Sequence, residues 1–333
     1  GGTFFLQSWH DAQKLKKRRS TSLRGKVVWI TGASSGIGRA LAIEFAKAGA
    51  KLILSARKIE ALNLVASECS TAVGLSDKTD KSSLQVARVL PFDLAEPMLE
   101  IRKHGVEAEE LWNAPVDILV NNGGISSRSA AEHTTLEVDK RVMDIDYFAP
   151  VALTKAVLPG MLTKGEGCIV VISSVQGRLA IPFRTSYAAA KHALHGFFEA
   201  FRAEVADRGV KVTIVCPGYV STNLSMNAVT GSGDAHAKLD EATAKGMRPE
   251  ALASKILDAV VMGKDEVCVC ADIVLVPFSS VHSDTGHPFS FIIHHLWRDV
   301  HMFLRRRLLP AFSSALRCQY FEIIHFWHQM RER

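Results

Sequence analysis

The stretch TGASSGIG, from Thr31 to Gly38, decides the fold. It directly follows a short apolar run, KVVWI at residues 26–30, and leads into a stretch with helical spacing at residues 38–50. Glycines at such a junction let the backbone turn tightly and approach a phosphate, and the start of the helix favours negative charge. A glycine-rich turn alone is weak evidence, but this strand–turn–helix context predicts a dinucleotide site.

The same alternation of apolar runs and helical patterns continues along the chain. Strand-like runs recur at residues 51–56, 86–94, 116–122, 168–174, 210–218 and 266–272, and helical spacing is found at 58–70 and 186–209. Apolar strands that alternate with helices predict a parallel sheet covered on both faces. We therefore expect an α/β fold, a doubly wound parallel sheet of the Rossmann type, in a single domain over residues 26–276.

Three segments depart from this pattern. Residues 1–25 are a basic leader, and we weigh two interpretations of it: the flank of a lost membrane anchor, or a disordered segment. Residues 223–248 are polar and weakly periodic, which predicts a substrate lid. Residues 277–333 are rich in aromatic and basic side chains. We expect a helical C-terminal extension there, which either lies on a membrane surface or packs on the core or a second subunit.

Charge and cysteine content narrow the class of protein. The net charge of +6 over 333 residues is concentrated toward the two ends of the chain. The middle is therefore no nucleic-acid binder, whereas basic ends beside apolar residues suit an anionic membrane surface. The sequence has no uninterrupted apolar run long enough to span a bilayer. Its six cysteines show no disulfide framework and no metal-ligand spacing, so we predict reduced thiols and no metal.

The end of the second strand selects the cofactor. Sites for NAD usually place an acidic residue there, which binds the ribose hydroxyls. This chain instead has Ser55, Ala56, Arg57 and Lys58. A guanidinium group suits a 2′-phosphate, so Arg57 predicts NADP(H) rather than NAD(H).

A tyrosine and a lysine supply the chemistry. In YAAAK, Tyr187 and Lys191 stand four residues apart, on one face of a helix. An ammonium group beside a phenol favours the phenolate and lowers the pKa of the phenol from its usual value near 10. Ser174 ends the preceding strand and can bond a carbonyl oxygen. Together these groups can protonate a carbonyl that receives a hydride.

These motifs make the chain similar to the short-chain dehydrogenases/reductases over roughly residues 25–275. The segments that carry the resemblance are TGASSGIG, NNGG, VVISS, YAAAK and PGYVST. The resemblance implies that Ser174, Tyr187 and Lys191 are catalytic and that Lys191 also holds the nicotinamide ribose. It further implies a cofactor site formed by Thr31, Gly32, Ser34, Ser35, Gly36, Ile37, Gly38, Asp93, Asn122, Pro217, Gly218 and Thr222. Gly123 stands where the family usually has alanine.

A narrower resemblance comes from DKRVM, IPFRTSYAAAKHA and PGYVSTNLSMNAVT. It points to a membrane-anchored subgroup of the family whose proposed activity is the reduction of acyl- or alkyl-dihydroxyacetone phosphate. This implies a lipid-like carbonyl substrate and a place at the endoplasmic reticulum or peroxisome membrane, with the catalytic domain facing the cytosol. A homo-oligomer is also consistent with the family. Lys238, Lys245 and Arg248 in the lid are candidate ligands for a substrate phosphate.

Two other functions remain open from the sequence. One is a steroid or retinoid carbonyl reductase, which would use the same catalytic residues. The other is a non-catalytic, cofactor-binding scaffold, because Asp146 replaces the asparagine that is the fourth catalytic member in the family. Asp144 and Asp146 do not face each other on a helix, so only Asp146 is expected at the site. Pro150 lacks the N–H that would bond the carbonyl of Asp146, so we expect that carbonyl to be free for another partner.

Overall fold

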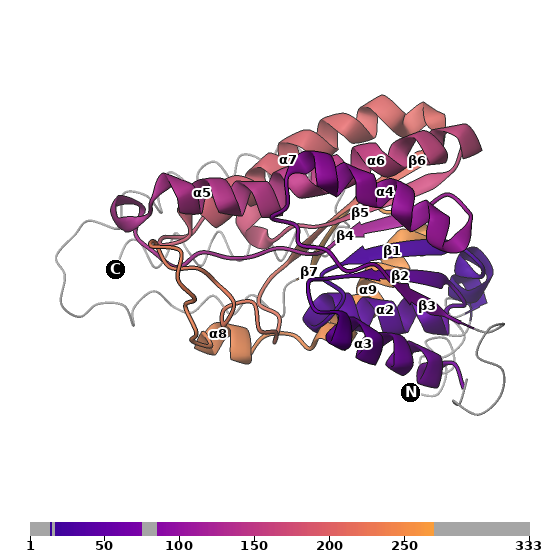
Figure 1. Cartoon of the computed structure of the whole chain (residues 1–333), viewed down its shortest axis with the longest axis horizontal. Coiled ribbons are helices and arrows are strands. Elements are labelled where there is room, and N and C mark those ends of the chain that lie inside the picture. The colour runs from indigo at the N-terminus through magenta and orange to yellow at the C-terminus, as the bar shows by residue number, and fades with distance from the viewer. Residues whose placement is uncertain (1–13, 15–16, 75–84, 270–333) are drawn as a thin grey trace, which may run out of the picture. The chain divides into compact units, whose positions relative to one another are not determined.

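The computed structural model describes residue 14, residues 17–74 and residues 85–269. Seven parallel strands form one sheet in the order β3-β2-β1-β4-β5-β6-β7 (Figure 1). From the centre, β1 to β3 extend the sheet to one side and β4 to β7 extend it to the other, so the strand order switches between β1 and β4. This confirms the predicted doubly wound sheet. The strands are β1 (Val27–Thr31), β2 (Lys51–Ser55), β3 (Ala87–Val89), β4 (Ile118–Asn121), β5 (Gly167–Ile172), β6 (Val210–Pro217) and β7 (Glu266–Val269).

Helices cover both faces of the sheet. Two hydrophobic cores result, and β1 contributes to both: Val28 and Ile30 pack in one, Val27 and Trp29 in the other. Such alternation is expected of a strand with two buried faces. On the first face lie α2 (Gly36–Lys47), α3 (Ile59–Ala72) and α9 (Pro249–Met262), and on the second α4 (Met98–Trp112), α6 (Ala149–Lys164) and α7 (Thr185–Val205) (Figure 1).

The described end of the basic leader packs against the domain. Residues 17–23 are helical, and Leu23 is buried in the first core. Arg19 pairs with Asp258 of α9 at 2.6 Å and also bonds Ser254. Part of the predicted leader is therefore structured. The predictions for residues 277–333 lie outside the described residues. Within the described part of the chain, no helix is both long enough and apolar enough to cross a bilayer.

The predicted lid, residues 223–248, is largely irregular, with one short helix, α8 (Glu241–Ala244). Isolated bridges join Ser127 to Val229 and Val220 to Met247, and these hold the segment to the body of the domain. Ser225 and Ala228 within it are fully buried. The segment is thus anchored at several points along its length.

The helix before α6 departs from α geometry. After α5 (Leu136–Met143), residues Asp144–Phe148 form a π-helix, in which the N–H of Ala149 bonds the carbonyl of Asp144. Pro150 follows directly and lacks an N–H of its own. The distortion therefore includes Asp146. The predicted free carbonyl of Asp146 stays a prediction.

Candidate active site

The carboxyl ends of the strands border one pocket of about 430 Å³. This is the edge at which open α/β sheets bind ligands, next to the switch in strand order between β1 and β4. The pocket brings together nearly all the site residues expected from the sequence. Those that line it are Thr31, Gly32, Ser34, Ser35, Gly36, Ile37, Arg57, Asp93, Asn122, Asp146, Ser174, Tyr187, Lys191, Pro217, Gly218 and Thr222.

The glycine turn is shaped to receive a phosphate. Gly32 has a positive φ of +62°, which suits glycine, and a Cβ there would lie 2.8 Å from the Cα of Gly123. No side chain caps the start of α2, and its first turn has no acidic residue. Its amide groups therefore remain available to an anion.

Gly38 is the one predicted cofactor residue that does not line the pocket. A Cβ at Gly38 would lie 2.3 Å from the carbonyl oxygen of Gly32. This glycine therefore lets α2 pack closely on the turn instead of facing the ligand, which is the role of the third glycine in such turns.

Asn122 braces the turn from β4. Its side-chain amide donates to the carbonyl of Thr31 at 2.9 Å, and its backbone N–H bonds the Thr31 hydroxyl. Next to it, a Cβ at Gly123 would lie 2.4 Å from a methyl group of Leu94. Leu94 thus occupies the space that the family's usual alanine would need.

No acidic residue follows β2 at the pocket. Arg57 and Lys58 line it instead, both exposed, and the Ser55 hydroxyl accepts a hydrogen bond from the Trp29 indole. The position that binds ribose hydroxyls in NAD sites is therefore cationic, as predicted.

The candidate catalytic side chains converge from β5, the π-helix and α7. Ser174 follows β5, and its hydroxyl accepts the N–H of Gln176 at 3.1 Å. Tyr187 and Lys191 lie on the buried face of α7, with the Lys191 ammonium 5.4 Å from the centre of the Tyr187 ring. Lys191 also donates to the carbonyl of Ile172 at 3.3 Å.

Asp146 is buried beside Lys191. Its Oδ1 accepts the N–H of Ile125 at 2.7 Å, and its Oδ2 lies 3.1 Å from the Lys191 ammonium. Burial raises the pKa of Asp146, and Lys191 and the Ile125 N–H offset this only in part. Burial on its own would lower the pKa of Lys191, but attraction to Asp146 and Tyr187 raises it above its usual value. Asp144 points elsewhere and pairs with Lys140, as expected.

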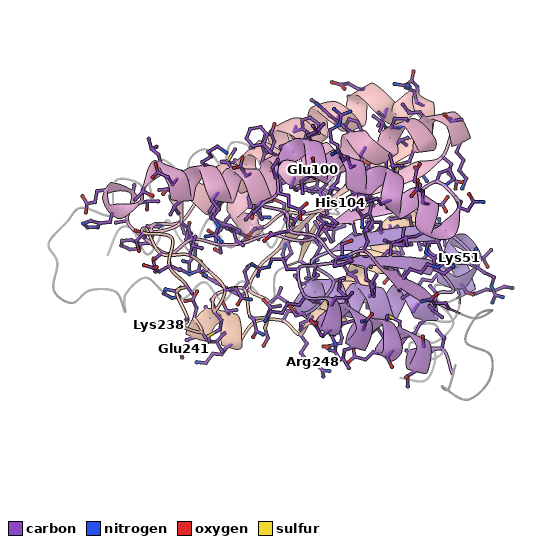
Figure 2. The ribbon with its side chains drawn as sticks, viewed as in Figure 1. Lys51, Glu100, His104, Lys238, Glu241 and Arg248 are labelled. Atoms are coloured by element: carbon purple, nitrogen blue, oxygen red, sulfur yellow. The ribbon has the colours of Figure 1, made fainter. Side chains whose placement is uncertain are left out.

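Two arginines at the pocket were missed in the sequence. Arg128 and Arg184 line it and share one carboxylate, Asp240 of the lid, at 2.7 and 3.2 Å. Arg184 directly precedes α7 and stands three residues before Tyr187, which is a signal that could have been used. Lys238, Lys245 and Arg248, which the sequence favoured, do not line the pocket and are exposed. Figure 2 shows Lys238 and Arg248 at the margin of the domain near α8.

These features are those of a dinucleotide-dependent oxidoreductase, and comparison with known proteins agrees. Residues 26–232 match the family model described as short chain dehydrogenase. The chain belongs to the short-chain dehydrogenase/reductase family and is an NAD(P)-dependent oxidoreductase of that family.

Individual similar proteins indicate the subgroup of the family to which the chain is related. A dehydrogenase/reductase SDR family protein 7-like from Drosophila melanogaster is 45% identical over 93% of this chain and 88% of its own. Dehydrogenase/reductase SDR family member 7B from Rattus norvegicus is 44% identical over 76% of each chain. Among solved structures, a putative NAD(P) dependent gluconate 5-dehydrogenase from Beutenbergia cavernae with bound NADP is 28% identical. It has a TM-score of 0.59 and covers 74% of this chain and 94% of its own. The expected subgroup, of the member 7B type, is confirmed.

Proposed function

We propose that the protein is an NADP(H)-dependent reductase that converts a ketone to a secondary alcohol on a lipid-like substrate bearing a phosphate. The observation that carries this proposal is the convergence of Ser174, Tyr187 and Lys191 on the same pocket as the glycine turn. When bound, the nicotinamide supplies the hydride. Ser174 holds the carbonyl oxygen, and Tyr187 gives it a proton. Lys191 binds the ribose and keeps positive charge beside the phenol.

Arg57 supports the choice of NADP(H). Its guanidinium, together with Lys58, replaces the acidic residue of NAD sites. The similar dehydrogenase from Beutenbergia cavernae was crystallised with NADP. Both observations point to a cofactor with a 2′-phosphate.

The shared Asp240 supports an anionic substrate. One carboxylate serves two guanidinium groups, so a positive charge remains at the pocket, and the Arg128 and Arg184 side chains are only 11% and 12% exposed. Burial, and then the neighbouring Arg128, lower the pKa of Arg184. A substrate phosphate close to the reacting carbonyl would compensate that charge.

Apolar residues beside the same opening support a lipid chain. Tyr219 and Leu224 line the pocket and are 46% and 38% exposed. An acyl- or alkyl-dihydroxyacetone phosphate combines a ketone, a nearby phosphate and an apolar chain. A neutral steroid or retinoid carbonyl would leave the arginine charge uncompensated. As the location, we propose the cytosolic face of the endoplasmic reticulum or peroxisome membrane, on the strength of the basic segments alone.

A paired substrate assay tests this function. Hexadecyl-dihydroxyacetone phosphate and an uncharged long-chain ketone are compared with purified protein and NADPH. We expect turnover of the phosphate substrate, with kcat/KM at least tenfold above that of the neutral ketone. Tyr187→Phe should abolish turnover and retain NADPH binding. Equal use of both substrates would refute the anionic substrate, and binding of NADPH without turnover of any carbonyl would favour a scaffold.

Arg184→Gln separates recognition from chemistry. Removing this guanidinium should raise KM for the phosphate substrate about tenfold or more, the loss expected for a charge-assisted hydrogen bond. The kinetics of the neutral ketone should change little. Lys245→Gln, outside the pocket and paired with Glu241, is the matched control.

A further inference from the structure

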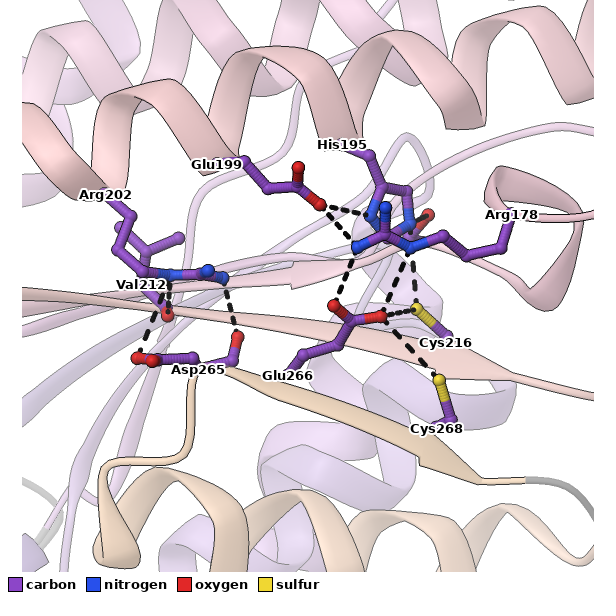
Figure 3. Close-up of polar contacts among 10 residues, drawn as sticks. Arg178, His195, Glu199, Arg202, Val212, Cys216, Asp265, Glu266 and Cys268 are labelled. Atoms are coloured by element: carbon purple, nitrogen blue, oxygen red, sulfur yellow. Dashed lines mark hydrogen bonds and ion pairs between the residues drawn. The ribbon is translucent and has the colours of Figure 1, made fainter. Parts of the chain in front are cut away.

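Four potential metal ligands meet on the sheet face that α7 covers, next to the catalytic pocket. They are His195 of α7, Cys216 of β6, and Glu266 and Cys268 of β7 (Figure 3). None has a role in the proposed reduction. Cys216 and Cys268 are register partners on adjacent strands, so their side chains project from the same face. Glu266 stands two residues before Cys268 and shares that face.

The distances between the ligand atoms suit a single small cation. Cys216 Sγ lies 3.6 Å from His195 Nε2 and 3.5 Å from Glu266 Oε1, and Cys268 Sγ lies 3.7 Å from that oxygen. Tetrahedral zinc, with bonds of about 2.3 Å to sulfur and 2.0–2.2 Å to nitrogen or oxygen, separates such atoms by about 3.5–3.7 Å. The ligand atoms of His195, Cys216 and Glu266 all lie within 4.8 Å of one another.

The second ring nitrogen of His195, Nδ1, is also in an environment typical of a metal ligand. The residue is 3% exposed, and its Nδ1 has no hydrogen-bond partner among the described residues. Glu199 Oε1 lies 3.5 Å from that nitrogen. A metal-binding histidine usually donates its second ring N–H to a carboxylate, which fixes the ring. Glu199 is placed to accept it once Nε2 binds a metal.

Arg178 completes the charge balance. It bonds Glu266 Oε2 at 2.7 Å and Oε1 at 3.3 Å and also pairs with Glu199, while both thiols lie on the Oε1 side (Figure 3). Two thiolates and one carboxylate around a divalent ion carry one excess negative charge, which the guanidinium offsets. Two present contacts must be given up. The Ser173 hydroxyl lies 3.1 Å from His195 Nε2 and would rotate away, and Arg178 would release its 3.3 Å bond to Glu266 Oε1.

We infer that His195, Cys216, Glu266 and Cys268 form a binding site for a thiophilic divalent cation, Zn²⁺. The sequence alone predicted no metal, because the ligands come from three elements that are far apart along the chain. With four protein ligands the site is closed and structural. The ion would join β6 and β7 to α7. His195 lies one helical turn after Lys191, and Cys216 directly precedes Pro217, so the ion would stiffen two walls of the pocket.

Metal titration of the untagged, reduced full-length chain tests the site. After chelator treatment, Co²⁺ serves as a spectroscopic probe. We expect one ion per chain, thiolate-to-cobalt charge-transfer absorption with intense visible bands of tetrahedral Co²⁺, and displacement of Co²⁺ by Zn²⁺. Zn²⁺ should also raise the melting temperature of the chelator-treated protein.

Variants assign the ligands. Cys268→Ser, at an exposed position, and Cys216→Ser should each remove the thiolate band in part and weaken binding more than tenfold. Glu199→Gln should weaken binding about tenfold and leave the band in place, as expected of a positioning residue. Cys69→Ser, at a buried cysteine of α3, is the control. A wild-type chain without the thiolate band, an oxidised Cys216–Cys268 pair under reducing conditions, or equal loss in the control would overturn the inference.

Discussion

At the scale of single residues, Asp146 sets the charge around the catalytic lysine. Its carboxylate lies 3.1 Å from the Lys191 ammonium, in a site where both groups are buried. An amide in the same place would accept the Ile125 N–H equally well and carry no charge. The acid therefore changes electrostatics while it keeps the local hydrogen bonding.

Asp146→Asn should shift the pH profile of reduction. Without the carboxylate, the positive charge of Lys191 has no buried counter-charge and acts more strongly on the proton donor beside it. We expect the basic limb of kcat/KM to move about one pH unit toward lower pH, with faster turnover near neutral pH. Asp144→Asn, which removes a carboxylate paired with Lys140, is the matched control. An unchanged profile would show that Asp146 is neutral for catalysis.

Arg57 carries the choice between the two nicotinamide cofactors. Arg57→Gln should raise KM for NADPH roughly tenfold or more, because a charge-assisted bond to the 2′-phosphate is lost. KM for NADH should change less than threefold. Steady-state kinetics with both cofactors measures this, and Lys47→Gln, at the far end of α2, controls for the loss of positive charge. A parallel rise in both KM values would contradict the assignment.

At the scale of secondary-structure elements, His104 fastens α4 to the loop after β3. Its ring bonds Glu107 of its own helix at 2.7 Å and Glu96 at 3.0 Å, and it stacks on Phe92 with 4.3 Å between ring centres. Figure 2 shows the ring on the side of α4. Burial on its own would lower the pKa of His104, but Glu107 and Glu96 outweigh it and raise that pKa.

Because the pKa of His104 is raised, the stabilisation from its ion pairs with Glu107 and Glu96 depends on pH. Protonation is favoured in the folded state, so the stabilisation is complete below the ordinary pKa of 6.5 and is lost as pH rises through the folded value. His104→Phe keeps the stacking and removes the ion pairs. We expect it to lower the free energy of unfolding by about 1 kcal/mol at pH 6 and to match wild type near pH 9. Denaturant titrations at both pH values measure this. His133→Phe, at a largely exposed histidine, is the control, and a difference that persists at pH 9 would contradict the mechanism.

The elements also show what the sequence could and could not predict. Each strand was found because a buried strand of a parallel sheet is apolar on both faces, as β1 is. Helix α4 was not identified, because it buries only Ile101, Gly105 and Ala108 and leaves apolar residues such as Leu99 and Val106 exposed, which blurs its helical pattern. The glycine turn and the candidate catalytic side chains have fixed local spacing, and the structure brings them to one pocket. The pairing of Asp240 with both Arg128 and Arg184 depends on the tertiary position of residues 223–248, which no local sequence pattern predicts.

At the scale of the described molecule, the basic leader and the domain overlap. The boundary expected at residue 26 follows the charge pattern, yet residues 17–23 form a helix whose Arg19 reaches α9 and whose Leu23 enters the core. The basic residues of this helix dominate its composition, so the composition does not reveal that Leu23 is buried. The packing of the first core therefore begins before β1.

Leu23→Ala tests whether the end of the leader is part of the folded domain. Leu23 is 2% exposed, so truncation removes buried methyl groups and leaves a cavity against the first core. We expect the free energy of unfolding to fall by about 2–4 kcal/mol. Leu64→Ala, at a leucine of α3 that is 62% exposed, should change it by about 0.5 kcal/mol or less. Urea titrations of both variants at equal m-value give the comparison. If Leu23→Ala costs no more than Leu64→Ala, the leader helix only rests on the domain, and the core begins at β1 as the charge pattern suggested.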